Sequence, residues 1–361
     1  MGDVELKKPF FAIFFALSCL VPLSGAYAQN TPDSTPPLPA PTMAAPVNPA
    51  PSNESSEAKN AEQKNNVEQN SVRTLPDGTS IAACLTPIEG MSCIPGGKFI
   101  RGSDNDAHNL TCAQPSNNDK SVANNAPQAD VWLQTYYMDK TEVTNAAYNA
   151  CVKAGKCVKS GPKYVDFDRP KQPITGISWY EANAFCKAQG KHLPTEAEWE
   201  KAARGENGDL YPWGNAPVSC DNAVIMNEKG RSCGQKKEKG KNPATGRVLE
   251  VCSRGESRYG LCDMIGNAEE WVADWYSKSY KDCGKDCEGI DPKGPCHGDD
   301  GQKCGKTHAK VVRGGAWYWP EEHATGIHRR SHLASNNPGH HFGFRCAASQ
   351  EEMLKLIEKQ K

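Results

Sequence analysis

The sequence has almost no net charge. Its 361 residues include 42 lysines and arginines against 43 aspartates and glutamates, a net charge of −1. Charge-driven binding to nucleic acid or to an acidic membrane surface needs a basic excess, so we expect neither partner. The sequence also lacks an apolar run that would cross a bilayer, since PFFAIFFALSCLVPL is shorter than the roughly 20 residues required. The length allows one large domain or two ordinary ones.

The short apolar run has the features of an export signal. Two lysines precede it, and the small-residue tripeptide AYA, ending at Ala28, follows it as a cleavage site. We therefore predict a signal peptide at residues 1–28, a mature chain beginning at Gln29, and a periplasmic or secreted protein. Lipidation at Cys19 is the alternative, although the residues before it match the motif poorly. Only lipidation would attach the chain to a membrane, and association with the outer membrane would follow.

Composition divides the rest of the chain. Residues 29–83 include TPDSTPPLPAPTMAAPVNPAPSNESS, a Pro/Ala/Ser-rich stretch that cannot bury a core, and we expect an extended, disordered tether. Aromatic residues and glycines become frequent from Cys84 onward. We therefore predict one folded domain at residues 84–348, followed by a C-terminal helix at 349–361.

Cysteine is plentiful. The chain has 16 cysteines, and removal of Cys19 with the signal peptide leaves 15. In an exported protein they are expected to form disulfides, and the isolated Cys112 is our candidate for the odd thiol. The close pairs and the one cluster are Cys84 and Cys93, Cys151 and Cys157, Cys220 and Cys233, Cys252 and Cys262, and Cys283, Cys287, Cys296 and Cys304. The last four also have a spacing that would pass for zinc ligands, but their polar, glycine-rich loop favours disulfides.

Helix signals are few but specific. Thr144 is placed to cap a helix, and Ser178 and Thr195 each have a glutamate three residues later, which makes two capping boxes. These two helices are expected to stop at Gly190 and Gly205. The C-terminal segment SQEEMLKLIEKQK starts with a third capping box. The remaining extended runs, KFIRGS, WLQTYYMDKTEVT, KVVRGGAWYW and HFGFRCAAS, are short and separated by long loops.

A set of motifs extends over about residues 91–348. They read CIPGGKFIRGSD, YYMDKTEVTNAAYNAC, PITGISWYEANAFCKAQGKHLPTEAEWEKAARG, YPWGN, YGLCDMIGNAEEWVADWY, RGGAW and FGFRC. In this order they resemble the formylglycine-generating, sulfatase-modifying-factor family. The resemblance implies an α+β fold, an elaborated C-type-lectin-like domain with a small twisted antiparallel core, flanking helices and much irregular loop.

The resemblance implies calcium sites and one disulfide. It places Ca²⁺ on the side chains of Asp263 and Glu270 and on the carbonyls of Gly266 and Ala268. Hard oxygen ligands and a glycine turn suit this ion. Asn267 is expected to hydrogen-bond within its own loop. A second site would use Asn222 and the carbonyl of Ala223, but its downstream acid is not recognisable. The resemblance also pairs Cys186 with Cys346, which would close a very long loop.

The resemblance further implies a catalytic pair that this sequence lacks. In formylglycine-generating enzymes, two cysteines after the RGG-x-aromatic motif hold Cu(I), which activates oxygen to oxidise a substrate cysteine. Trp319 and Ala324 stand at those positions here. Neither offers the soft sulfur donor that Cu(I) needs, so we expect no copper and no catalytic residues. Ala203 and about Arg329 stand where the cysteines of a further family bridge would be. Fold and function separate readily, so a different task on the same fold is expected.

Histidines gather near the replaced pair. Six of the nine lie between His308 and His341. One interpretation is a new imidazole site for iron or copper near His323, with Glu321 or Glu322. No helix is expected in this stretch to present histidines as an i, i+4 ligand pair, so we expect loop histidines instead of a transition-metal site.

Aromatic and basic residues lie where the family's substrate groove would be. The expected groove residues are Tyr318, Trp319, His323, Arg329 and Arg330. Aromatic faces combined with guanidinium groups recognise peptides or sugars. Trp317 and Phe344 are expected in the core. The preferred hypothesis is an exported, calcium-stabilised, non-oxidative domain that binds a polypeptide or a glycan in the cell envelope. The alternatives are an oxidase of protein cysteines with a non-standard metal site, and a structural component of an envelope assembly.

Overall fold

The computed structural model describes residues 73–104, 124–236, 246–298, 304–305, 308–335 and 339–361. All of them belong to a compact unit at residues 65–361. The predicted signal peptide, Cys19, Cys112 and most of the predicted tether lie outside the described residues. The end of that tether is described, and there Leu75 is buried and Thr74 pairs with Ser80 in an isolated bridge.

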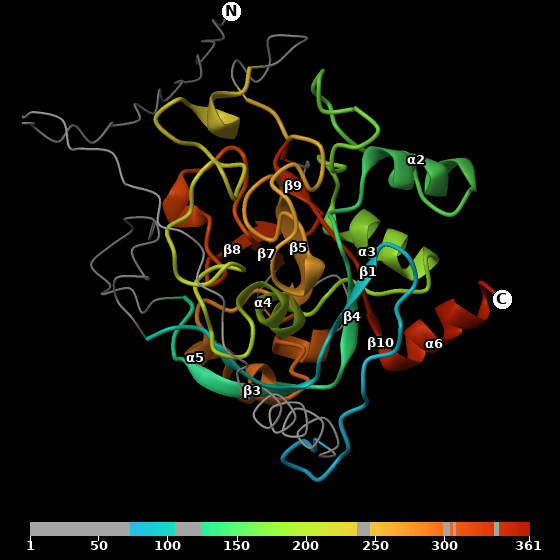
Figure 1. Cartoon of the computed structure of the whole chain (residues 1–361), viewed down its shortest axis with the longest axis vertical. Helices are drawn as coiled ribbons and strands as arrows, with labels where there is room; N and C mark the ends of the chain where they lie inside the picture. The colour runs from blue at the N-terminus through green and yellow to red at the C-terminus, as the bar shows by residue number, and fades with distance from the viewer. Residues whose placement is uncertain (1–72, 105–123, 237–245, 299–303, 306–307, 336–338) are drawn as a thin grey trace, which may run out of the picture. The chain divides into compact units, whose positions relative to one another are not determined.

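A four-stranded sheet carries the RGG corner. Its strand order is β8 (Arg329–Leu333), β7 (Ala309–Arg313), β5 (Glu269–Trp275) and β9 (Phe342–Gly343). β7 runs antiparallel to both β5 and β8, whereas β9 runs parallel to β5. The strands β8, β7 and β5 lie side by side near the middle of the molecule (Figure 1). The corner therefore emerges from a central strand.

Two three-stranded sheets complete the strand structure. One has the order β1 (Met91–Ile94), β4 (Tyr136–Asp139) and β10 (Ala347–Ser349), with both pairings antiparallel. The other has the order β2 (Gly97–Arg101), β3 (Ala129–Leu133) and β6 (Gly289–Ile290), and β6 is parallel to β3. The predicted mixture of short strands and irregular loops is confirmed.

The helices begin where the capping residues predicted. Thr144 caps α2 (Asn145–Lys153), and capping boxes at Ser178 and Thr195 start α3 (Trp179–Ala188) and α4 (Glu196–Arg204). A third box at Ser349 starts α6 (Gln350–Glu358), which packs against β10 (Figure 1). The remaining helical segments are short: α5 (Tyr280–Cys283) and the 3₁₀ turns η2 (Arg231–Gly234), η3 (Arg258–Gly260), η4 (Gly284–Cys287), η5 (Pro295–Gly298) and η6 (Glu321–His323). Within the described ranges, no helix has the length and apolar character of a membrane span.

Seven disulfides tie the loops to these elements. Six are local: Cys84–Cys93, Cys151–Cys157, Cys220–Cys233, Cys252–Cys262, Cys283–Cys287 and Cys296–Cys304. The seventh, Cys186–Cys346, links α3 to the segment before β10 over a sequence separation of 160. The four clustered cysteines are thus paired with one another, so the zinc interpretation is wrong: their sulfurs are not free to be thiolate ligands.

Candidate functional site

The chain folds back on itself just after β7. Gly315 has a φ of +69°, and a Cβ at this position would lie 2.6 Å from the carbonyl oxygen of His323. Only glycine tolerates this conformation and this close approach. The contact holds His323 and the buried Ala324 against the corner, while Trp317 and Phe344 are fully buried, as predicted for core residues.

A patch of aromatic rings and guanidinium groups follows the corner. We call Arg231, Tyr318, Trp319, His323 and Arg330 the aromatic–guanidinium patch. The rings of Tyr318 and Trp319 lie 4.9 Å apart, and those of Trp319 and His323 lie 5.3 Å apart. The Cζ of Arg231 lies 3.6 Å from the Tyr318 centroid, and that of Arg330 lies 4.7 Å from the Trp319 centroid. Tyr318, Trp319 and both arginines are partly exposed, so the patch presents adjacent rings and cations to solvent.

A buried carboxylate holds one of the two arginines. Arg330 Nη1 donates to both oxygens of Glu269 at 2.9 and 3.2 Å, and His341 Nε2 lies 3.9 Å from Glu269. Burial raises the pKa of Glu269 to about 7, although the guanidinium of Arg330 opposes the shift. The ion pair positions Arg330 beside Trp319.

The imidazole of His323 meets that of His328 on the buried side of the patch. Nδ1 of His323 lies 3.2 Å from Nε2 of His328, which is hydrogen-bonding distance. Burial lowers the pKa of His323, and Arg330 adds to this effect. Burial also lowers the pKa of His328 well below its usual value, with His323 and Arg330 as further causes. Both rings are therefore neutral near pH 7, and one donates to the other.

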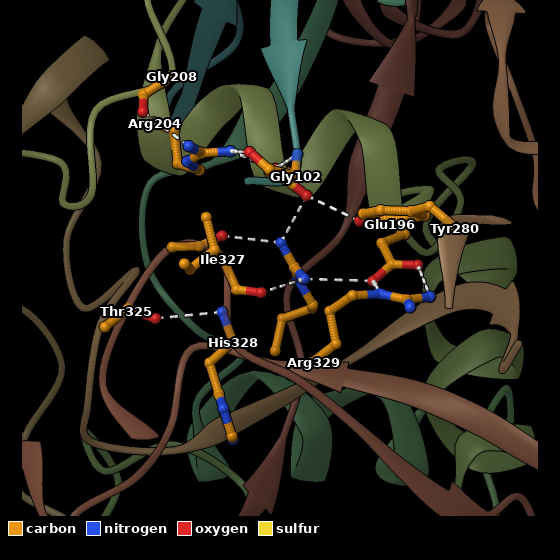
Figure 2. Close-up of polar contacts among 12 residues, drawn as sticks. Gly102, Glu196, Arg204, Gly208, Tyr280, Thr325, Ile327, His328 and Arg329 are labelled. Atoms are coloured by element: carbon orange, nitrogen blue, oxygen red, sulfur yellow. Dashed lines mark hydrogen bonds and ion pairs between the residues drawn. The ribbon is translucent and has the colours of Figure 1, made fainter. Parts of the chain in front are cut away.

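Arg329 does not line the groove, so that part of the prediction is wrong. Its side chain is 1 % exposed and binds Glu196 through two hydrogen bonds of 2.6 and 2.8 Å (Figure 2). Its Cζ also lies 4.2 Å from the ring centroid of Tyr280. Burial alone would lower the pKa of Arg329, but Glu196 raises it, so the guanidinium stays charged. Arg329 therefore forms a buried ion pair with Glu196 inside the core. The alternation of β8 turns Arg329 inward and Arg330 outward.

A second buried arginine fixes the backbone beside His328. Arg313 Nη2 donates to Glu200 at 2.8 Å and to the Gly326 carbonyl at 2.7 Å, and Nη1 donates to the Ile327 carbonyl at 3.4 Å (Figure 2). Burial would raise the pKa of Glu200, but Arg313 and Arg204 outweigh it and the pKa falls. Removing one member would leave a buried charge, which costs about 3–5 kcal/mol. The site thus rests on a rigid charged support.

The predicted calcium residues lie in an acidic pocket of the core. Both oxygens of Glu270 accept hydrogen bonds from Arg345, and Trp199 Nε1 donates to Oε2 at 2.8 Å. Burial raises the pKa of Asp263 to about 6. Burial, together with Asp263 and Glu270, raises the pKa of Glu142 well above its usual value. Two buried carboxyl groups, Glu142 and Glu270, and the partly buried Asp263 therefore lie around the guanidinium of Arg345, an acidic excess that a hard divalent cation would neutralise.

The loop of the expected calcium ligands passes close to a neighbouring segment. Gly266 has a φ of +82°, and a Cβ there would lie 2.7 Å from the Val224 carbonyl oxygen, which explains the glycine. The expectation that Asn267 hydrogen-bonds within its own loop is wrong. Its side chain accepts a hydrogen bond from the Leu249 amide and donates one to Glu142 at 2.9 Å. In the described part of the chain, no three His, Cys, Asp or Glu side chains form a group that could hold a metal ion. Two carboxylates with two carbonyls are a smaller set, and this site stays a prediction.

The second calcium site and the histidine site also stay predictions. The side chain of Asn222 accepts a hydrogen bond from the Ser219 amide at 2.8 Å, so it closes a turn, and Ala223 is buried. The His323 ring meets the ring of His328 at an Nδ1–Nε2 distance of 3.2 Å, and Glu322 raises the pKa of His323 against the effect of burial.

Two residues of these sites were missed in the sequence. Arg231 lies in a polar loop far from the RGG motif, and nothing local marks it as a partner of Tyr318. Glu142 lies inside the YYMDKTEVT motif, yet its partner Ala268 is 126 residues away. Both are found only when the loops are folded together.

The fold and the site define a domain of the sulfatase-modifying-factor type. The family model described as "Sulfatase-modifying factor enzyme 1-like domain" matches residues 78–350, so the chain belongs to this family. The resemblance and the elaborated C-type-lectin-like fold predicted from the motifs are thereby confirmed.

Known proteins resemble the chain to different extents. YfmG of Bacillus subtilis is 34% identical over 214 residues, which are 52% of this chain and 42% of YfmG. A formylglycine-generating enzyme of Thermomonospora curvata is 29% identical over 314 residues, 72% of this chain and 93% of that enzyme. The structure of PvdO from Pseudomonas aeruginosa matches with a TM-score of 0.52 at 21% identity, and covers 73% of this chain and 99% of PvdO. The chain thus spans less than half of YfmG, and the likeness to PvdO concerns the fold alone.

Proposed function

We propose that this chain is an exported, non-oxidative member of the family that binds a polypeptide or a glycan at the aromatic–guanidinium patch. The supporting observation is the ring that stands in place of a sulfur ligand: at the RGG corner, Trp319 meets Tyr318 edge-on, lies tilted against His323 and carries Arg330 on its face. Stacked aromatic faces with cations bind ligands through contact area and hydrogen bonds.

The state of the cysteines argues against copper-dependent oxidation. The fourteen cysteines in the described residues form seven disulfides, so none of them is a thiolate. Cu(I) prefers soft sulfur ligands. The donors beside the corner are instead the imidazoles of His323 and His328. An oxidase with a non-standard metal site is therefore the weaker alternative.

The disulfides also support export. Stable disulfides form in oxidising compartments such as the periplasm or the extracellular space. Their number here suits a domain with many irregular loops, which disulfides stabilise by restricting the unfolded chain.

Calcium belongs to the same proposal. We place Ca²⁺ on Asp263, Glu270 and the carbonyls of Gly266 and Ala268, where the ion would offset the burial that, with Glu270 as a smaller cause, raises the pKa of Asp263 to about 6. The ion would be structural, because this cluster lies in the core and not on the patch.

A ligand screen with matched variants tests the binding function. Protein from an exporting host, with its disulfides intact, is applied to peptide and glycan arrays beside Trp319→Ala and Trp213→Ala. Trp213 is another partly buried indole that stacks on Tyr211 and is not a member of the patch, and it serves as the control. We expect at least one ligand that wild type and Trp213→Ala bind and Trp319→Ala loses. Equal binding of every ligand by wild type and Trp319→Ala would refute the proposal and favour a structural role.

A further inference from the structure

The polar groups of the patch that lack a hydrogen-bond partner among the described residues are donors. Arg231 forms no ion pair or hydrogen bond with the described residues, and its cation contact is the Tyr318 ring. Arg330 uses Nη1 for Glu269, and no bond within the described chain is formed by its other guanidinium nitrogens. The Nε1–H of Trp319 is shielded from solvent and meets no acceptor there. Guanidinium and indole N–H groups cannot accept, so a fitting ligand must supply acceptors.

The exposed acids that follow Trp319 in the chain do not pair with these cations. Glu321 and Glu322 are exposed on η6, and neither forms an ion pair with Arg231 or Arg330 in the described structure. Glu321 acts instead on Tyr211, where burial and this carboxylate raise the pKa of the phenol. Among the described residues, Arg231 therefore has no acidic partner, whereas Arg330 is paired with Glu269 on one edge of its guanidinium.

The two cations are joined through adjacent rings. Arg231 lies over Tyr318, Arg330 lies over Trp319, and the two ring centroids are 4.9 Å apart. Stacking holds each guanidinium plane against a ring and leaves its edge for an in-plane acceptor. Carboxylates match that edge with two parallel, charge-assisted hydrogen bonds.

We propose that the ligand of this patch is an acidic segment of a polypeptide, with carboxylates bound by Arg231 and Arg330 and the neighbouring chain packed on Tyr318 and Trp319. This inference rests on the proposed binding function and specifies its ligand. A neutral sugar would leave Arg231 without a charged partner, and a sulfated glycan is the competing anion that the test must separate.

Arg231 is the better residue to change. Arg330→Gln would leave Glu269 buried without its partner and could unfold the domain. Arg231 has no such partner, so Arg231→Gln removes only the charge and the stack. Lys229→Gln, two residues earlier and exposed, removes the same charge from the same loop and is the control.

Fluorescence anisotropy provides the measurement. The probes are a labelled glutamate-rich peptide, the same peptide with glutamine at every glutamate, and a labelled heparin fragment. We expect the acidic peptide to bind wild type and Lys229→Gln equally, and at least about tenfold more weakly to Arg231→Gln. The glutamine peptide should bind weakly to all three proteins, and added salt should weaken only the acidic peptide.

Two results would overturn the inference. One is equal binding of the acidic and glutamine peptides, or equal affinity of Arg231→Gln and wild type. The other is binding of heparin alone, which would make the ligand a sulfated glycan. If Trp319→Ala loses a ligand that Arg231→Gln retains, the patch remains a binding site and only the acidic-peptide assignment fails.

Discussion

The disulfide between Cys186 and Cys346 should dominate the stability of the domain. It spans 160 residues, whereas Cys283–Cys287 spans 4. In the chain-entropy model, these lengths correspond to about 5 and about 2 kcal/mol at 25 °C. Four shorter disulfides lie inside the long loop and shorten it, but the logarithmic dependence changes the estimate by only about 0.2 kcal/mol.

Paired alanine variants test this difference. The double variants Cys186→Ala/Cys346→Ala and Cys283→Ala/Cys287→Ala are compared with wild type by urea denaturation, with tryptophan fluorescence as the signal. We expect the first to lose about 3 kcal/mol more than the second. A domain with a total stability of about 5–15 kcal/mol would then be close to its folding limit. Equal losses, or a smaller loss for the long loop, would refute the reasoning.

Three further predictions concern pH, calcium and the RGG corner. The carboxylates of Glu198 and Glu352 outweigh burial and raise the pKa of His192 to about 10. The ion pairs of His192 with these two glutamates should therefore stabilise the fold fully below about pH 6.5 and lose this effect toward pH 10. The side chain of His192 is 29 % exposed in wild type. His192→Asn should lower the free energy of unfolding by about 1–2 kcal/mol at pH 6.5 and by almost nothing at pH 10. A difference that does not change with pH would contradict this. Chelation should lower the Tm of wild type but not of Asp263→Asn, and an equal fall in both would exclude the proposed calcium ligand. Gly315→Ala should destabilise the domain by about 1–3 kcal/mol in thermal unfolding, and a neutral result would show that the corner relaxes.

Helix starts were readable in the sequence because capping is local. The Ser178 box joins residues three positions apart, and both its hydrogen bonds form as predicted. The same holds for Thr195 and Ser349. The loop disulfides are local in the same sense, since the structure joins the cysteines that lie close together in the chain.

The central strand β5 was not recognised for a physical reason. Its sequence EEWVADW shows no alternation of polar and apolar residues, because nearly every side chain is buried. Glu269 and Glu270 are compatible with burial only through Arg330 and Arg345, which lie 61 and 75 residues away. Such long-range charge pairing is invisible in a window of sequence.

The patch was only half predictable. Tyr318, Trp319 and Arg330 follow one motif and were placed correctly near one another, whereas Arg329 was misplaced by one step of the strand alternation. Arg231 reaches Tyr318 from a separate loop, and only the folded chain brings it there.

The most direct test of the central claim is mass spectrometry of a peptide with the pattern Cys-x-Pro-x-Arg after incubation with the exported protein, Cu(I) and oxygen. The account predicts that the cysteine keeps its thiol, because Trp319 and Ala324 stand where sulfur ligands would be needed and the fourteen cysteines of the described residues are paired in disulfides. Conversion of that thiol to an aldehyde by the purified protein would contradict it.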